Sequence, residues 1–371
     1  MTSLPGSLSS LPAELVELVG SYAQPKGLLN LRLTSKGVAA KTLRIMTSKC
    51  FGGLHIMIAS PHSLKRAAAL NKHETLGKQI RTVTVHLDAP FEQSESQWSS
   101  LRDGMYHASR DHPEAKHLQG ICEEWRMEAE ELACSGADHR ALTAILKSLS
   151  AGNRAVSLCV RGGVSQLKDD VPADFNSLSS VTSTNLRPRL NPRNVGDRQL
   201  DSVFAAVRKS DIKLSGIHIP YAYQIGFGAP LSIFQGVLGS RALQPALQDL
   251  RTLRLYIPLI EDWRGNEVLA SDEDLNAAME SFSKSVPNLS ILDLSGGYSV
   301  LALKHPLNRL FGRMIQRVRF PHMSYIKVGS IFIRSSTELV HFLERHASTL
   351  ERYHFKAVWC HDLQVDSDWS L

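Results

Sequence analysis

Seven short segments of this chain repeat one arrangement of apolar residues, and the repetition restricts the folds available to it. Each segment has an apolar residue, two other residues, an apolar residue, one other residue and a final apolar residue. The last two apolar positions alternate, which is the periodicity of a β-strand with one buried face. The segments are Ile80/Val83/Val85, Ala155/Leu158/Val160, Leu214/Ile217/Ile219, Leu250/Leu253/Leu255, Leu289/Leu292/Leu294, Ile315/Val318/Phe320 and Leu350/Tyr353/Phe355. We therefore expect a strand at each of them.

Helical periodicity precedes several of these expected strands. Residues 138–149, 272–286 and 336–350 each place apolar side chains three and four positions apart, as on one face of a helix. Helices that alternate with strands in units of 25–40 residues are typical of leucine-rich-repeat-like solenoids, where units stack because none can cover its own apolar face. The unit lengths are irregular, so an open α/β sheet is the alternative. The predicted fold class is α/β (α+β overall), with an irregular leucine-rich-repeat-like α/β solenoid over residues 137–371.

Composition indicates an ordinary globular protein. Apolar residues make up 43% of the 371 residues and charged residues 21%. No run of apolar residues is long enough to span a membrane, and the first residues do not have the pattern of a secretory signal. The five cysteines are widely spaced and include no Cys-x-x-Cys pair, which favours reduced thiols. We therefore expect a protein of the cytoplasm or nucleus with no membrane association.

The chain is basic, with a formal net charge of +6. In the first fifty residues, six Lys and Arg residues oppose two Glu residues. A basic surface meets either nucleic acid or an acidic protein, and charge alone does not identify the partner. These cations are spread over the segment without interleaved aromatic residues, so we do not expect nucleic-acid binding.

The first fifty residues predict two short amphipathic helices separated by a turn that contains Pro25. A segment of about 40 residues rarely buries enough apolar surface to fold by itself. Its apolar faces must therefore be covered, either by the rest of the chain or by another protein. These two possibilities lead to different functions.

The residues of this segment resemble the F-box, a helical module of ubiquitin ligases. The resemblance covers residues 8–90 and rests on Leu11-Pro12, the apolar residues from Leu15 to Val19, and Leu28-Leu29-Asn30-Leu31. It continues, as in a set of filamentous-fungal F-box proteins, through Lys41-Thr42-Leu43, Phe51-Gly52-Gly53-Leu54, Pro61-His62-Ser63-Leu64 and Ile80 to Val85. Gln24 and Gly27 stand where F-boxes usually have Asp, so the second helix is expected to lack a side-chain N-cap, at a cost of about 1 kcal/mol.

The resemblance implies a substrate-receptor subunit of an SCF-type cullin–RING ubiquitin ligase. It divides the chain into an F-box module at 8–50, a connecting region with the first strand at 51–136, and a repeat domain at 137–371. The module would dock on the Skp linker protein, and through it on a cullin, while the repeats present an unknown protein substrate. By resemblance the docking residues are Leu11, Pro12, Leu15, Val16, Val19 and Leu28, whereas Leu18, Leu31 and Leu33 hold the module together. The alternative is a non-catalytic interaction scaffold whose N-terminal helices pack on its own repeats.

Residue patterns that carry catalysis or bind metals are not convincing in this sequence. His107, His112 and His117 recur every five residues, a spacing that puts no two of them on one helix face. Cys360, His361 and Asp362 are adjacent, whereas catalytic groups normally come from separate segments. We therefore expect no catalytic residue, metal site or cofactor, and no enzymatic activity of the chain alone.

Two segments stand apart from the repeats. Residues 93–136 are polar and are expected to be helical and solvated. Residues 166–197 combine several prolines and serines with few apolar residues, which predicts a long loop.

Overall fold

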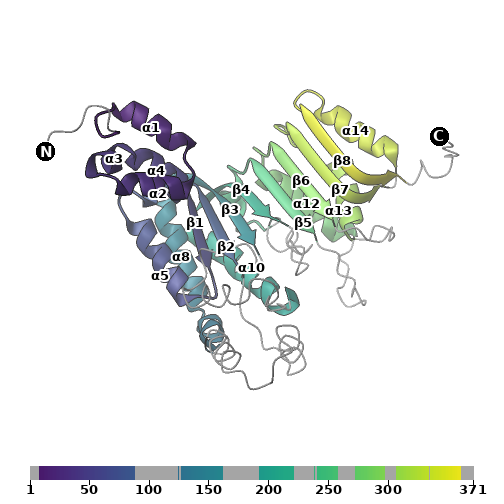
Figure 1. Ribbon diagram of the computed structural model, residues 1–371. Helices are drawn as coiled ribbons and strands as arrows, with labels where there is room; N and C mark the ends of the chain where they lie inside the picture. Colours follow the sequence, from purple (N-terminus) through teal and green to yellow (C-terminus); the bar gives the residue numbers. More distant parts are fainter. Residues whose placement is uncertain are drawn as a thin grey trace, which may run out of the picture.

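The strands form a single parallel sheet in which spatial order follows chain order from β1 to β8 (Figure 1). The computed structural model describes residues 8–87, 124, 127–161, 192–220, 238, 240–257, 272–296, 306–333 and 335–360. Every neighbouring pair is parallel. The strands are β1 (Gly53–Met57), β2 (Thr82–His86), β3 (Ala155–Arg161), β4 (Lys213–Ile219), β5 (Thr252–Ile257), β6 (Ile291–Gly296), β7 (Tyr325–Ile333) and β8 (Arg352–Cys360). The fold class is therefore α/β.

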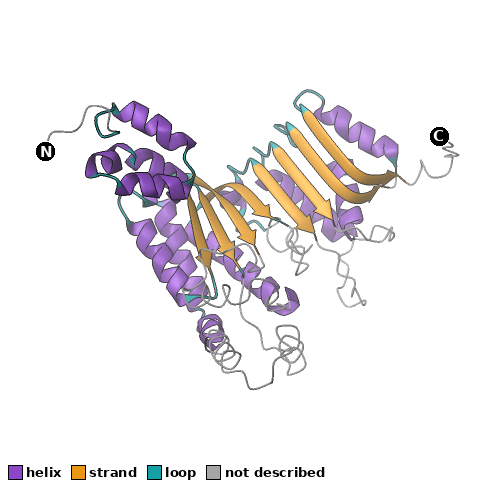
Figure 2. Cartoon of the chain, viewed as in Figure 1, coloured by secondary structure: helices purple, strands orange, loops and turns teal. Residues whose placement is uncertain are grey.

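Helices pack along one face of this sheet, and a separate group of helices precedes it (Figure 2). The N-terminal group comprises α1 (Ala13–Tyr22), α2 (Pro25–Leu33), α3 (Lys36–Lys41) and α4 (Leu43–Phe51). The helices along the sheet are α5 (Pro61–Lys72), α8 (Ala137–Ser150), α10 (Pro192–Ser210), α11 (Gln244–Leu247), α12 (Asp272–Ser285), α13 (Pro306–Arg317) and α14 (Ser336–His346). A 3-10 helix, η1 (Gly77–Gln79), leads into β2.

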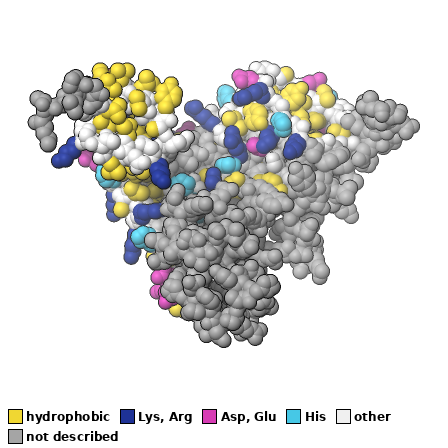
Figure 3. Space-filling view, in the orientation of Figure 1, with side chains coloured by type: hydrophobic (Ala, Val, Ile, Leu, Met, Phe, Trp, Pro, Cys, Tyr) yellow, Lys and Arg dark blue, Asp and Glu magenta, His cyan; other side chains and the backbone are white. Residues whose placement is uncertain are grey.

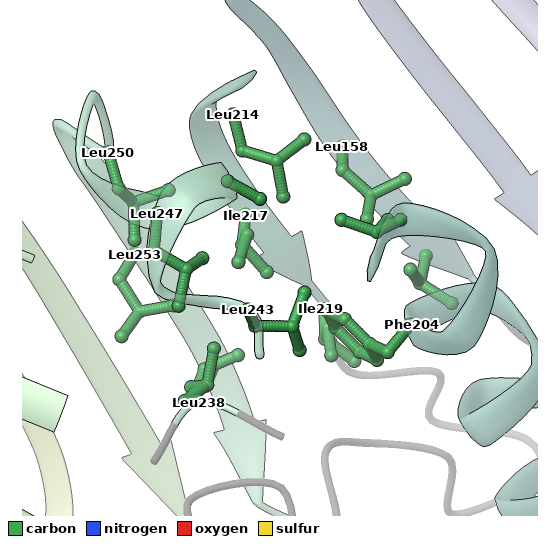
Figure 4. Close-up of a cluster of buried hydrophobic side chains, with 14 of the residues drawn as sticks. Leu158, Phe204, Leu214, Ile217, Ile219, Leu238, Leu243, Leu247, Leu250 and Leu253 are labelled. Carbon is green, nitrogen blue, oxygen red and sulfur yellow. The ribbon is translucent and has the colours of Figure 1, made fainter. Parts of the chain in front are cut away.

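One continuous hydrophobic core lies between the sheet and these helices. It extends from Leu54 in β1 to Phe342 in α14. Figure 4 shows the central part of this core, where Ile219 of β4 lies near Phe204 of α10, and Leu253 of β5 lies near Leu247 of α11. Alternate strand residues point into the core, so the remaining side chains of each strand lie on the opposite face.

Neighbouring strands are joined at their N-terminal ends by a recurring hydrogen-bond pattern. The carbonyl oxygen of a residue just before one strand accepts hydrogen bonds from two successive backbone N–H groups at the start of the next strand. The acceptors are Gly52 for Arg81 and Thr82, Arg251 for Ser290 and Ile291, Ser290 for Ser324 and Tyr325, and Ser324 for Glu351 and Arg352, at 2.8–3.1 Å. The same geometry therefore recurs at the β1–β2 pair and at the three successive pairs from β5 to β8.

Most of the expected elements are confirmed. Six of the seven apolar segments lie at strands β2 to β6 and β8, and the three expected helices correspond to α8, α12 and α14. The segment Ile315/Val318/Phe320 was assigned wrongly, because residues up to Arg317 belong to α13 and the strand that follows is β7. Strand β1 was not expected at all. The expected division of the chain between residues 136 and 137 stays a prediction.

Three expectations outside the strands also need revision or lie partly beyond the described residues. The N-terminal segment forms four helices and not two. The expected loop at 166–197 is wrong at its end, because α10 begins at Pro192, where a proline is tolerated in the first helical turn. Residues 127–135 are helical as expected, whereas 93–123 and 166–191 lie outside the described residues.

A buried histidine of α14 links this helix to the segment that follows α13 and makes stability sensitive to pH. In His346, Nδ1 donates to the carbonyl oxygen of Phe342 at 2.8 Å, and Nε2 accepts the backbone N–H of Phe320 at 3.0 Å. Burial lowers the pKa of His346 below its ordinary 6.5, and the nearby guanidinium groups of Arg345 and Arg319 lower it further.

We expect this histidine to stabilise the fold at neutral pH and to cost stability in acid. Because its pKa is lower in the folded state, the unfolded chain binds more protons once the pH falls below about 6.5. The free energy of unfolding should therefore decrease as the pH drops through that value toward the folded pKa. Urea unfolding between pH 7.5 and 5 should show a smaller pH slope in His346→Gln, while the exposed His341→Gln variant should keep the wild-type slope. Equal slopes in all three proteins would contradict the assignment.

Candidate protein-interaction site

The four N-terminal helices pack closely on one another around small and branched side chains. On α1, Val16 and Gly20 point inward and are buried. A Cβ atom at Gly20 would lie 3.2 Å from Leu28 Cδ1 and 3.6 Å from Ile45 Cγ2, so glycine permits the close approach of α1 to α2 and α4. The side of α1 that faces the interior of the module is therefore the side with the smaller side chains.

Several cations of the module are used to join its segments. Lys41 Nζ donates to the carbonyl oxygens of Ser9 at 2.8 Å and Leu11 at 2.5 Å. Lys49 Nζ donates to the carbonyl oxygens of Ser21 and Ala23 at the C-terminal end of α1, where positive charge is favoured. Part of the basic excess of this segment thus has a structural role.

An exposed ion pair also connects α1 to α4. Arg44 Nε donates to both carboxylate oxygens of Glu17, at 3.0 and 3.2 Å, and Arg44 Nη2 makes a further bond. The hydrogen bonds from Arg44 lower the pKa of the Glu17 carboxyl group. This pair fixes the orientation of α1 relative to α4 more than it adds to stability, because exposed ion pairs contribute little.

The cap of α2 is weak, as the sequence indicates. The side chain of Gln24, at the N-cap position, makes no capping hydrogen bond, and Pro25 occupies the first turn. By contrast, Ser35 Oγ accepts the backbone N–H of Val38 at 3.2 Å and caps α3. The start of α2 is therefore held by packing and not by a cap.

The outward side of α1 is a stripe of large apolar side chains. Its members are separated by three and four residues, and their exposed fractions are 47% for Leu15, 53% for Leu18, 46% for Val19 and 82% for Tyr22. Leu29 and Leu33 of α2 and Leu43 at the start of α4 are also exposed. We call these seven residues the apolar face, and Figure 3 shows hydrophobic side chains gathered over the N-terminal helices.

This concentration of exposed apolar residues is confined to one part of the molecule. Among the described residues, the other large apolar side chains that are exposed are Leu8 beside the module and Met127, Val340 and Tyr353, which lie singly. Scattered apolar side chains are normal on protein surfaces, whereas a gathered set usually marks a binding site. An amphipathic helix with apolar residues at i, i+3, i+4 and i+7 is suited to docking in a groove or against partner helices.

The structure divides the expected docking residues into two groups. Pro12, Leu15 and Val19 are exposed and Leu11 is half-buried, whereas Val16 and Leu28 are completely buried. Val16 and Leu28 therefore form the interior of the module and are not accessible to a partner in this arrangement.

The residues expected to hold the module together also need correction. Leu18 and Leu33 are exposed, and Leu31 is half-buried. For Leu18 the reason is the packing at Gly20, which places the small side chains of α1 on the inner side of the helix and the large ones on the outer side. Sequence reasoning missed Tyr22, Leu29 and Leu43, although the spacing from Leu15 to Tyr22 was a visible signal.

Elsewhere, the sheet brings polar and titratable side chains together without forming a recognisable catalytic arrangement. Cys159 Sγ lies 3.9 Å from His218 Nδ1 and accepts a hydrogen bond from Arg161 Nε at 3.4 Å, but the thiol is buried. His55 Nδ1 lies 3.3 Å from His86 Nε2, and their rings stack. Within the described ranges, no three His, Cys, Asp or Glu side chains form a group that could hold a metal ion.

The other expected chemical groups lie at or beyond the boundary of the described residues. Cys360 is half-buried at the end of β8, whereas His361 and Asp362 are outside the described residues, as are His107, His112 and His117. No helix in the described part of the chain combines the length and apolar character that crossing a membrane requires.

Comparison with known proteins adds no assignment. No family model and no curated protein matches the chain.

Proposed function

We propose that this chain is a substrate-receptor subunit of an SCF-type cullin–RING ubiquitin ligase. Residues 8–50 act as an F-box of the kind found in filamentous-fungal proteins and dock on the Skp linker protein, which connects them to a cullin. The units that follow form a leucine-rich-repeat-like solenoid and present a protein substrate, in the cytoplasm or nucleus. The chain itself is non-catalytic: it raises the effective concentration of a substrate lysine near a ubiquitin thioester carried by another subunit.

The observation that carries this proposal is the apolar face. Leu15, Leu18, Val19 and Tyr22 form a continuous helical stripe that the rest of the chain leaves exposed. The alternative, a scaffold whose first helices pack on its own repeats, would require this stripe to be covered by the sheet or its helices. The exposed fractions therefore favour an external partner.

The solenoid part of the proposal is supported by the regularity of the sheet. The parallel strands follow chain order, and an equivalent hydrogen-bond pattern recurs at the N-terminal ends of β5 to β8. Both features are typical of stacked repeats. A doubly wound α/β sheet would instead change strand order and have helices on both faces.

Capture of purified Skp linker protein by the full-length chain tests the docking role. The double variant Leu15→Gln/Val19→Gln removes two half-exposed apolar side chains from α1 and retains good helix formers. Burying the exposed half of each contributes about 1 kcal/mol, so we expect a loss of affinity of roughly 30-fold. Calorimetric titration or surface plasmon resonance measures this change.

The matched control is Met127→Gln/Val340→Gln, which replaces two exposed apolar residues elsewhere. This control should bind like wild type, and circular dichroism should show unchanged helix content in all variants. Failure of the wild-type chain to bind the linker protein, or undiminished binding by Leu15→Gln/Val19→Gln, would exclude the proposed docking mode.

A further inference from the structure

The face of the sheet opposite the helices has a row of polar side chains, with one residue from each of six neighbouring strands. Parallel pairing places these residues in direct register, and neighbouring strands are about 4.8 Å apart. The row consists of Cys159, His218, Arg254, Asp293, Lys327 and His354. These positions are far apart in sequence, so only the sheet brings them together.

Positive charge dominates this face from β5 to β8. Arg254, Arg352 and Lys356 are exposed, and Lys327 is half-buried. Figure 3 shows Lys, Arg and His side chains gathered over these strands. We call Arg254, Lys327, Arg352 and Lys356 the cationic face.

Part of the charge on this face has no acidic partner among the residues that the structure describes. Among the described residues, the acid in the row is Asp293, which pairs with Lys327 at 3.0 Å. Arg254 and Lys356 make no ion pair with another described residue, and the Arg352 guanidinium lies over the Tyr325 ring, 5.5 Å from its centroid. The pKa of the neighbouring His218 is lowered, first by burial and then by the charges of Arg254 and Arg161, which is consistent with a positive local potential.

Protection of the sheet edge explains only part of this pattern. Natural sheets place charges on edge strands to prevent pairing with other chains, and Arg352 and Lys356 lie on the edge strand β8. Arg254 and Lys327 lie on the inner strands β5 and β7, where no edge needs protection. The inner cations therefore call for another explanation.

We infer that the cationic face binds an acidic segment of a protein, and, resting on the function proposed above, that this segment belongs to the substrate. An extended peptide can place carboxylates opposite Arg254 and Lys356 and a neutral or basic residue opposite Asp293. A nucleic-acid strand has a charge at every nucleotide and would bring phosphate groups against the Asp293 carboxylate. The acid within the row thus favours a peptide with separated acidic residues over a regular polyanion.

Fluorescence anisotropy of the full-length chain with a labelled peptide in which glutamate and glycine alternate, so that the acidic residues are separated, tests this inference. Binding should weaken with added salt, because exposed charges are screened. The double variant Arg254→Gln/Lys356→Gln removes two cations that pair with no acid in the described ranges and should weaken binding about tenfold. The control Lys284→Gln/Arg317→Gln removes the same charge from exposed positions on α12 and α13 and should bind like wild type.

Each other outcome would overturn the inference. Equal losses in both double variants would indicate attraction by net charge alone, and no loss in Arg254→Gln/Lys356→Gln would remove the cationic face from binding. Tighter binding of an oligothymidylate of equal charge would identify a nucleic-acid surface instead.

The two proposals can fail separately. Capture of the Skp linker protein should be unchanged in Arg254→Gln/Lys356→Gln, and peptide binding should be unchanged in Leu15→Gln/Val19→Gln. Peptide binding without linker capture would leave the cationic face intact as a site and exclude the ligase role.

Discussion

Replacing Gly77 by alanine should lower the free energy of unfolding by about 3 kcal/mol, a large fraction of the stability of a typical domain. A Cβ atom at this position would lie 2.1 Å from the carbonyl oxygen of Asn71 and 3.0 Å from its carbon. These are backbone atoms at the end of α5, so they cannot rotate away as a flexible side chain would. The Asn71 side chain also donates to the carbonyl oxygen of Ile145 in α8 at 2.9 Å, so a shift of Asn71 would disturb the contact between the two helices.

Gly312 provides the matched control for this substitution. It lies inside α13, and a Cβ atom there would meet no atom within 4 Å. Alanine should therefore raise the free energy of unfolding by about 0.5–1 kcal/mol through its higher helix propensity. Urea unfolding midpoints at constant m-value measure both changes. A Gly77→Ala variant as stable as wild type would contradict the close contact between η1 and the end of α5.

The strand pattern illustrates how far the sequence predicts this fold. The arrangement of apolar residues recurs once per strand, including two instances that were overlooked: Phe51/Leu54/Ile56 at β1 and Met323/Ile326/Val328 at β7. The segment Ile315/Val318/Phe320 satisfies the same pattern but ends a helix. Phe311, Met314, Ile315 and Val318 are spaced by three and four residues and are buried on one side of α13 and the turn after it. A short apolar segment fits both the helical and the strand periodicity, and only the packing of the neighbouring unit decides which structure forms.

The two proposed binding surfaces differ in how far the sequence predicts them. The apolar face lies on one helix and its spacing can be read directly, but which side of α1 faces inward depends on the fit of Gly20 against Leu28. The cationic face cannot be predicted from the sequence unless the pairing of the strands is known. Arg254, Asp293 and Lys327 become neighbours only because β5, β6 and β7 pair in register. Local periodicity predicts which side of each strand faces solvent, whereas the register between distant strands comes from the stacking of complete units.

The aromatic cluster beneath the last four strands should be the most sensitive part of the core to truncation. Phe282 of α12 is fully buried and meets the Phe320 ring edge-on, with the centroids 6.1 Å apart. Phe320 in turn lies beside His346, which contacts Phe342 with centroids 4.5 Å apart. We expect Phe282→Ala to lower the free energy of unfolding by about 3–5 kcal/mol, because it removes buried apolar area and leaves a cavity among side chains that cannot collapse to fill it.

Tyr22→Ala is the corresponding control on an exposed aromatic residue. Tyr22 belongs to the apolar face and is 82% exposed, so its removal should change stability by less than about 0.5 kcal/mol. Urea unfolding of both variants separates an aromatic residue that supports the fold from one that is available to a partner. A Tyr22→Ala protein destabilised as strongly as Phe282→Ala would mean that the apolar face is covered by its own chain. In that case the stripe on α1 would no longer indicate an external partner, and the scaffold alternative would replace the receptor.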